Sequence, residues 1–119
     1  MISHIVCFRF RPGVSWADPR AETAEIITRE HPRYIPEIRS WTVGRNRTDR
    51  VAAYDFALVG QFDDRAALDR YMSHPDHQRG VRAWSELSSW VVVDLDHATD
   101  AASYVLDGDE LSILEKAEQ

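Results

Sequence analysis

The chain has 119 residues, 44% of them hydrophobic, which is enough for one domain with a core of its own. Its net charge of −6 is uneven: residues 1–96 hold 13 basic and 14 acidic side chains, whereas residues 97–119 hold one basic and six acidic ones. A body of nearly balanced charge argues against nucleic-acid binding, which needs a basic excess. No apolar run reaches the roughly 20 residues of a membrane span, so we expect no membrane partner.

The cysteine content and the first residues of the chain indicate in which cellular compartment we expect the protein. Cys7 is the single cysteine, which excludes an internal disulfide and zinc sites built from several cysteines. The first residues lack the basic and apolar regions of a signal peptide. We therefore expect a cytoplasmic domain over residues 1–96 with an acidic C-terminal extension over residues 97–119.

The first part of the chain predicts a strand, a helix and a second strand. Apolar side chains alternate along residues 2–11, as in a half-buried strand. Asp18 and Pro19 are the residue types of a helix N-cap and of the first helical position. This helix is expected to end near His31, because a residue that precedes proline disfavours helical backbone. Residues 38–45 form the next expected strand.

The second part predicts a strand, two helices and a final strand. The third strand is expected over residues 52–62, and Asp63-Asp64 should cap the helix that follows. Pro75 separates this helix from another one, and residues 90–95 form the last strand. The order β-α-β-β-α-α-β is typical of an α+β, ferredoxin-like fold with a four-stranded antiparallel sheet.

The predicted sheet has apolar side chains on both faces of the strands at 2–11, 52–62 and 90–95. So few helices can cover only one face, and apolar surface left in water costs about 25 cal/mol per Å². We therefore expect a homodimer in which two sheets pack face to face. The alternative is that the extension, which carries a short helix signal from Asp109, folds back over the sheet.

Short segments spread over residues 1–96 form an ordered set that is recognisable as a whole. They are His4-Ile5-Val6, Phe8-Arg9-Phe10, Ile35-Pro36-Glu37-Ile38, Trp41-Thr42-Val43-Gly44, Tyr54-Asp55-Phe56, Tyr71-Met72-Ser73-His74-Pro75-Asp76-His77 and Val91-Val92-Val93-Asp94. This set resembles the stress-responsive A/B barrel domain family, or Dabb, of dimeric α/β barrels. The resemblance implies a ferredoxin-like protomer and a barrel that two protomers form across a two-fold axis.

The resemblance also implies candidate site residues without fixing one activity. The family includes plant stress proteins without an assigned reaction and a plant polyketide cyclase that works without a cofactor. The catalytic pair of the cyclase matches Tyr71 and His77, and a further pocket histidine matches His4. Phe56 stands where the cyclase has another pocket histidine, and the first helix offers no clear match for its pocket tyrosine. Two functions therefore remain possible: a related but different reaction in the pocket, and ligand binding without a reaction.

Three of the four singled-out side chains have both a functional and a structural interpretation, and the fourth, His74, has a structural one. His77 falls in the first turn after Pro75, where the helix dipole disfavours the imidazolium and favours a neutral general base; it could equally be a surface or capping residue. Tyr71 could donate a hydrogen bond to a substrate carbonyl, or be a core tyrosine. His4 lies on the apolar face of the first strand, where most histidines are structural. His74 is expected to anchor the turn.

The pocket between the sheet and the helices is expected to be apolar. Its predicted lining consists of Val6, Phe8, Phe56, Leu68, Met72, Val81 and Trp84. We expect no metal, because His4, His74 and His77 do not have the spacing of a metal site. The resemblance to a cofactor-free cyclase implies that no cofactor is needed. Arg45, Arg47 and Arg50 could clamp an anionic group of a ligand, or form a solvated loop.

The predicted function is binding of a small hydrophobic or aromatic ligand. It could be a cofactor-free cyclase or lyase that acts on a polyketide-like or aromatic carbonyl compound, with His77 as general base. The alternatives are a non-catalytic, stress-responsive dimeric binding protein and a cofactor-free monooxygenase.

Overall fold

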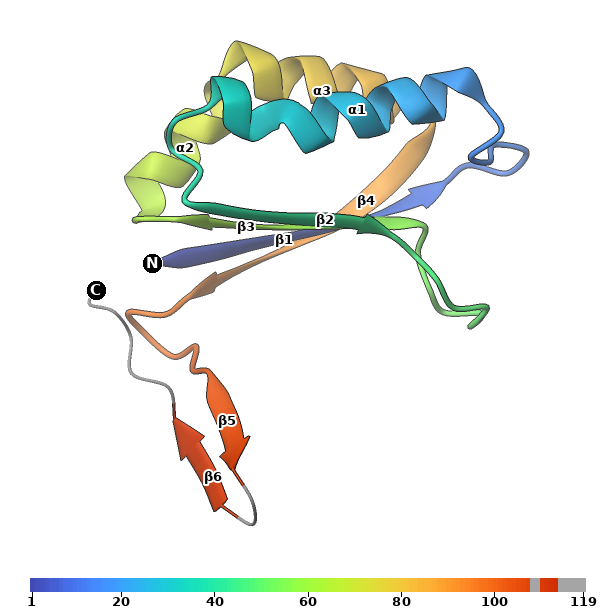
Figure 1. Cartoon of the computed structure of the whole chain (residues 1–119). Helices are drawn as coiled ribbons and strands as arrows, with labels where there is room; N and C mark the ends of the chain where they lie inside the picture. The colour runs from blue at the N-terminus through green and yellow to red at the C-terminus, as the bar shows by residue number, and fades with distance from the viewer. Residues whose placement is uncertain (108–109, 114–119) are drawn as a thin grey trace.

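The computed structural model describes residues 1–107 and 110–113. The body consists of two layers, a four-stranded sheet and helices packed on one of its faces (Figure 1). Its elements are β1 (Ile2–Phe10), α1 (Pro19–Tyr34), β2 (Ser40–Arg45), β3 (Phe56–Phe62), α2 (Arg65–Ser73), α3 (Pro75–Ser85) and β4 (Ser88–Asp96). The strand order is β2-β3-β1-β4 and all neighbours are antiparallel, which confirms the ferredoxin-like α+β fold.

Helix α1 continues past its predicted end at His31 as far as Tyr34. Pro32 lies inside the helix and has no N–H to donate to the carbonyl of Thr28. The indole of Trp41, on β2, donates to that carbonyl instead over 3.0 Å. This substitute hydrogen bond keeps the Thr28 carbonyl paired where the proline cannot bond to it. Like every helix in the described part of the chain, α1 lacks the length and apolar composition to cross a membrane.

Two strands have bounds that differ from the predicted ones, because side-chain hydrogen bonds and pairing with the neighbouring strand determine where each strand begins and ends. β3 begins at Phe56 rather than near residue 52, and the carboxylate of the preceding Asp55 accepts the backbone N–H of Phe10 over 2.8 Å. That side-chain bond takes the place of a ladder bond at the end of β1. β4 is longer than predicted because it pairs with β1 along the whole length of that strand.

A sharp break separates α2 from α3 at the predicted place. His74 has extended backbone, and its Nδ1 accepts the backbone N–H of Asp76 over 3.0 Å, which caps α3. Pro75 follows at the first helical position, where its missing N–H leaves no bond unmade. The break puts Tyr71 near the end of α2 and His77 in the first turn of α3, with both side chains buried against the sheet.

Two apolar clusters join the helices to the sheet. The larger one consists of Val6, Phe8, Ala21, Ala24, Phe56, Leu58, Trp84 and Leu87. The smaller one consists of Ile2, Ile35, Phe62, Ala67, Leu68 and Tyr71. His4, Thr28, His31 and His77 are buried polar side chains of the same layer. The chemistry-bearing residues of this chain are therefore in the core.

The face of the sheet that points away from the helices is apolar and uncovered. Val91 and Val93 on β4 are 52% and 54% exposed, and Val59 and Leu95 are also exposed. β4 is an edge strand, and Val92 on its other face is exposed as well. β4 therefore has uncovered apolar side chains on both faces, as the sequence predicts.

The C-terminal extension contains a hairpin of two strands, β5 (Tyr104–Asp107) and β6 (Glu110–Ile113). The predicted short helix from Asp109 is wrong for residues 110–113, which form β6; residues 109 and 114–119 lie outside the described residues. A segment this short gains little from helical hydrogen bonds, whereas pairing with β5 supplies partners for its backbone. The hairpin extends away from the body on the side opposite the helices (Figure 1), and it leaves the valines of β4 exposed.

Candidate functional site

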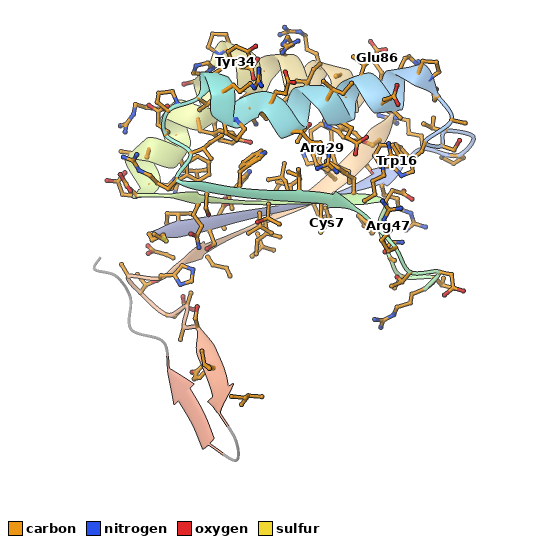
Figure 2. The ribbon with its side chains drawn as sticks, viewed as in Figure 1. Cys7, Trp16, Arg29, Tyr34, Arg47 and Glu86 are labelled. Carbon is orange, nitrogen blue, oxygen red and sulfur yellow. The ribbon has the colours of Figure 1, made fainter. Side chains whose placement is uncertain are left out.

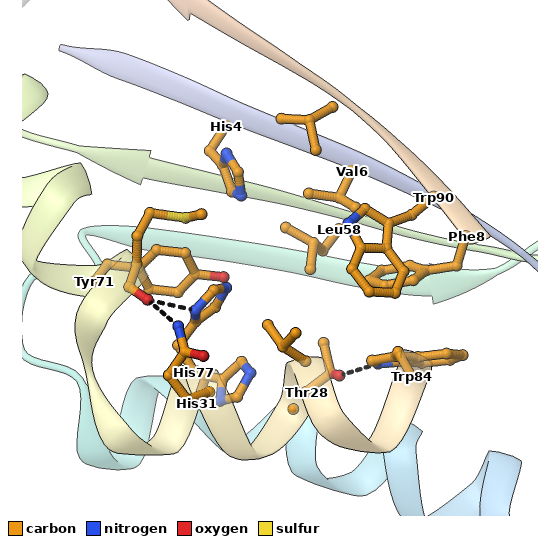
Figure 3. A pocket seen from close by; sticks show the side chains of 15 residues that line it. His4, Val6, Phe8, Thr28, His31, Leu58, Tyr71, His77, Trp84 and Trp90 are labelled. Carbon is orange, nitrogen blue, oxygen red and sulfur yellow. Dashed lines mark hydrogen bonds between the residues drawn. The ribbon is translucent and has the colours of Figure 1, made fainter. Parts of the chain in front are cut away.

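A cavity of about 260 Å³ lies between the inner face of the sheet and the helices (Figure 3). Its lining includes members of both core clusters, so it lies where these clusters meet. One end is aromatic, with Phe8, Trp84 and Trp90. The other end is polar and is formed by Tyr71 with His4, His31 and His77, which come from four different elements.

Most of the apolar side chains that were predicted to line a pocket lie at this cavity, namely Val6, Phe8, Met72, Val81 and Trp84. Phe56 and Leu68 do not line it. Phe56 is buried against Trp84, with ring centroids 5.3 Å apart, and Leu68 belongs to the smaller core cluster. Periodicity tells which face of a strand or helix a residue occupies, but not how far along that face a cavity extends.

Tyr71 presents a buried phenol at the polar end. The residue is 1% exposed, and its ring centroid lies 4.4 Å from that of His77 and 5.6 Å from that of His4. Burial, with a contribution from the Asp94 carboxylate, raises the pKa of the phenol well above its ordinary value, so the hydroxyl keeps its proton at neutral pH. Within residues 1–107 and 110–113 the hydroxyl has no hydrogen-bond partner. Leaving such a group unpaired costs about 1–3 kcal/mol, which marks it as a donor for a ligand.

His77 presents a neutral imidazole beside that phenol. Its Nδ1 lies 2.9 Å from the carbonyl oxygen of Met72, which also accepts the side-chain amide of Gln78 over 2.7 Å (Figure 3). A carbonyl can only accept, so Nδ1 carries the proton and Nε2 carries the lone pair. Burial is the main reason why the pKa of His77 is lowered to about 4; the neighbouring His31 also lowers it, whereas the hydrogen bond to the Met72 carbonyl raises it. The neutral state is thus due mainly to desolvation, not only to the helix dipole invoked from the sequence.

His4 is held by a carboxylate from the neighbouring strand. The two residues are direct partners in the β1–β4 ladder, and Nδ1 of His4 lies 2.5 Å from Oδ1 of Asp94. His4 is buried at the cavity, while the Asp94 side chain is 42% exposed. The carboxylate fixes the imidazole with its proton on Nδ1 and stabilises the charge that forms if Nε2 takes up a proton.

His31 is a cavity residue that the sequence reasoning placed only on the apolar stripe of α1. Its Nδ1 lies 2.7 Å from a carboxylate oxygen of Asp76 at the start of α3. Burial lowers the pKa of His31, whereas the Asp76 carboxylate opposes this effect. The sequence signal was a histidine at helical spacing from Ala21, Ala24 and Ile27, which by itself does not distinguish a core residue from a site residue.

The remaining candidates lie outside the cavity. His74 caps α3, and Cys7 points from the opposite face of the sheet (Figure 2). Arg45 forms hydrogen bonds of 2.6 and 3.1 Å with the buried carboxylate of Glu25, so its guanidinium is not a ligand clamp. In the described residues no three His, Cys, Asp or Glu side chains gather as metal ligands do.

Taken together, the layers and the cavity define a ferredoxin-like α+β protein with a site of small-molecule size. The stress responsive A/B barrel domain (Dabb) model matches residues 2–97, and the chain belongs to this family. An uncharacterized protein of Streptomyces coelicolor is 40% identical over 94 residues, which cover 79% of this chain and 97% of that protein.

Solved structures share the fold. A dimeric ferredoxin-like protein of unknown function from Thermobifida fusca has a TM-score of 0.70 and 26% identity, covering 79% of this chain and 88% of the other. A hydroxynitrile lyase from Passiflora edulis has a TM-score of 0.67 and 17% identity, covering 79% and 90%. At that identity the lyase shows the fold alone, so the residues of this chain must supply any argument about activity.

Proposed function

We propose that this protein binds an uncharged aromatic carbonyl compound in the cavity and removes a proton next to the carbonyl without a cofactor. The observation that carries this proposal is the pair formed by Tyr71 and His77. A buried phenol without a partner in the described residues lies beside an imidazole whose Nε2 carries a lone pair. One group can donate to a carbonyl oxygen and the other can accept a proton.

The proposed step begins when the Tyr71 hydroxyl donates a hydrogen bond to the carbonyl oxygen of the bound compound. Nε2 of His77 then takes a proton from the adjacent carbon, and the electron pair moves into an enolate whose oxygen the same hydroxyl stabilises. In a cyclase the enolate carbon attacks a second carbonyl of the same molecule; in a lyase it expels a leaving group. The proton returns from His77 to the product oxygen or to the leaving group.

The low pKa of His77 makes it a weak base in the protein alone. The developing enolate places negative charge beside the imidazole, which favours its protonated form and raises its pKa during the reaction. If that compensation is too small, the cavity binds without turnover. The low pKa of His77 is therefore the observation that supports the second candidate function, a non-catalytic, stress-responsive binding protein.

The test is hydrogen–deuterium exchange at the benzylic carbon of phenylacetone in D₂O, followed by NMR. We expect the protein to accelerate the exchange and His77→Ala to abolish the acceleration. Tyr71→Phe should reduce it about 100–1000-fold, as loss of a hydrogen bond to a developing oxyanion does. The matched control is His74→Asn, because His74 lies outside the cavity and asparagine also caps helices. Binding without exchange would favour the second candidate.

We also propose that two copies pair through the uncovered faces of their sheets. The support is the row of exposed apolar side chains on β4 and β3 together with structural relatives that are dimeric, at 26% identity. Covering this face removes apolar surface from water, which at about 25 cal/mol per Å² is the main available driving force. The hairpin of β5 and β6 extends from the same side and would lie near the partner.

A further inference from the structure

His31 is a third imidazole at the cavity, and its surroundings hold it in a defined position. The side chain is 3% exposed, and its Nδ1 is bonded to Asp76 Oδ2. The other oxygen of Asp76 accepts the guanidinium of Arg79 over 3.1 Å. Because a carboxylate of lowered pKa accepts the Nδ1 proton, Nε2 of His31 carries a lone pair.

Gly80 on α3 provides the space for this imidazole. A Cβ at this position would lie 2.8 Å from Nε2 and 3.0 Å from Cε1 of His31. Any larger residue would push the ring out of its place in the wall of the cavity. Glycine weakens a helix interior by about 1 kcal/mol relative to alanine, so close approach of His31 is a physical reason for its presence.

The polar end of the cavity offers several acceptors and one donor. The Nδ1 protons of His4, His31 and His77 go to Asp94, Asp76 and the Met72 carbonyl respectively. No Nε2 atom of these three rings has a hydrogen-bond partner in the described part of the chain. Tyr71 supplies the donor. A ligand that satisfies this set needs a carbonyl oxygen and at least one hydroxyl group.

The described lining also offers no permanent positive charge. Among the described residues no lysine or arginine lines the cavity, and the acidic side chains of Asp94 and Asp76 contact His4 and His31 in its wall. An anionic group would therefore lose its hydration without gaining a counter-ion. The site is suited to hydroxyl groups on an uncharged ring, which the aromatic end can stack against.

Building on the proposed function, we infer that Nε2 of His31 is a second polar subsite, which accepts a hydrogen bond from a hydroxyl group of an uncharged aromatic carbonyl ligand. This subsite determines specificity and takes no proton from carbon. It adds hydroxylated aromatic ketones and arylacetaldehydes, which carry a hydrogen on the carbon next to the carbonyl, to the proposed function as the preferred substrate class. In this subsite His31 accepts the hydrogen bond, Asp76 fixes the imidazole and Gly80 leaves space for it.

The probes are the three hydroxybenzaldehyde isomers, their methyl ethers and the formylbenzoates, with affinity measured by isothermal titration calorimetry. They have no hydrogen on the carbon next to the carbonyl, so they report binding alone. We expect one hydroxy isomer to bind at least about 10-fold tighter than its methyl ether, because the ether cannot donate to Nε2. The formylbenzoates should bind more weakly than either. Equal affinities for a hydroxy isomer and its ether in all three pairs would overturn the inference, as would no binding of any isomer at millimolar concentration.

His31→Asn is the matched variant. The asparagine amide can still donate to Asp76, but no atom replaces Nε2. The hydroxyl-to-ether affinity ratio should fall to about one in this variant and stay unchanged in His74→Asn, since His74 lies outside the cavity. A ratio that persists in His31→Asn would assign the selectivity to His4 or His77 and overturn the inference.

Wild-type protein labelled with ¹⁵N-histidine gives a readout that does not depend on a folded variant. The hydroxy isomer should shift the Nε2 resonance of His31 and its ether should not; the reverse pattern, or no shift, contradicts the subsite. The two proposals fail separately. If the hydroxy isomer binds tighter than its ether but the protein does not accelerate hydrogen–deuterium exchange, the catalytic step is refuted and the subsite remains. If the protein accelerates the exchange but binds each hydroxy isomer and its ether equally well, the subsite is refuted and the catalytic step remains.

Discussion

The inner and outer faces of the sheet are built from similar apolar side chains, yet they have different surroundings. Val6 and Leu58 on the inner face are covered by helices, and the nearby imidazoles of His4 and His77 are held by a carboxylate and a carbonyl group. Val91 and Val93 on the outer face are more than half exposed. Covered apolar surface with fixed polar groups forms a site for a small molecule, whereas uncovered apolar surface is suited to a protein partner.

The largest expected effect comes from placing a charge on the outer face. We expect Val93→Asp to raise the dimer dissociation constant by at least about 100-fold, because an unpaired carboxylate would be buried between two sheets. Sedimentation velocity at micromolar concentration would show a monomer. Val51→Asp is the control, because Val51 is a loop residue that is 96% exposed. If Val93→Asp remained dimeric, the interface would lie elsewhere.

The pH dependence of stability separates the two faces next, because the buried histidines of the described residues, His4, His31 and His77, lie on the helix side of the sheet. The pKa of His77 is about 4 in the folded chain against 6.5 for the free side chain, so the unfolded chain binds a proton first as the pH falls. Stability from this group is present above pH 6.5 and decreases toward pH 4, by on the order of 1 kcal/mol per pH unit. Burial shifts His31 in the same direction.

The measurement is chemical denaturation between pH 4 and pH 7.5. His77→Gln should flatten the slope, while His74→Gln should leave it unchanged. A wild-type curve that is flat over this range would show that His77 is not desolvated. Carboxylates of lowered pKa, such as Asp76 and Glu25, add their own loss below about pH 5, so the slope above that pH reports the histidines.

Gly80 tests how closely the cavity wall is packed. Gly80→Ala is expected to destabilise the chain by about 1 kcal/mol, because the clash with His31 outweighs the gain in helix propensity. Thermal denaturation measures the change. Gly44→Ala is the control, since nothing lies within 4 Å of a Cβ at that position. A stabilised Gly80→Ala would mean that His31 can move aside at little cost.

Tyr71→Phe should give the smallest change, and one of opposite sign. It removes a buried hydroxyl that has no partner in the described residues, so we expect a gain in stability of up to about 1 kcal/mol. Thr28→Val should instead destabilise, because the Thr28 hydroxyl accepts the indole of Trp84 over 2.7 Å. Denaturation curves of both variants compare the Tyr71 hydroxyl, which we propose binds a ligand, with the Thr28 hydroxyl, which stabilises the fold. A loss of stability in Tyr71→Phe would indicate that its hydroxyl has a structural role.

How much of this could be predicted from the sequence differs between fold and site. Alternation and capping residues identified the elements of the body in their correct order, and the Pro75 break fell where His74 and Pro75 predict it. The helix end near His31 was wrong, because a side chain distant in sequence, Trp41, satisfies the carbonyl that Pro32 leaves free. Residues 110–113 form a strand because β5 offers them a partner.

For the candidate site, the sequence identified side chains but not their partners. Tyr71, His77 and His4 do meet at one cavity, whereas Phe56 and Leu68 fill the core around it. The pairing of His31 with Asp76 spans 45 positions, and no local pattern signals it.

The sequence by itself determined the ferredoxin-like order of elements and the excess of apolar surface on the sheet, because periodicity and turn residues act locally. Only the tertiary structure decided which imidazoles are buried and which nitrogen of each keeps its proton. Those properties depend on desolvation and on acceptors such as Asp94 and Asp76, which folding brings together from distant parts of the chain.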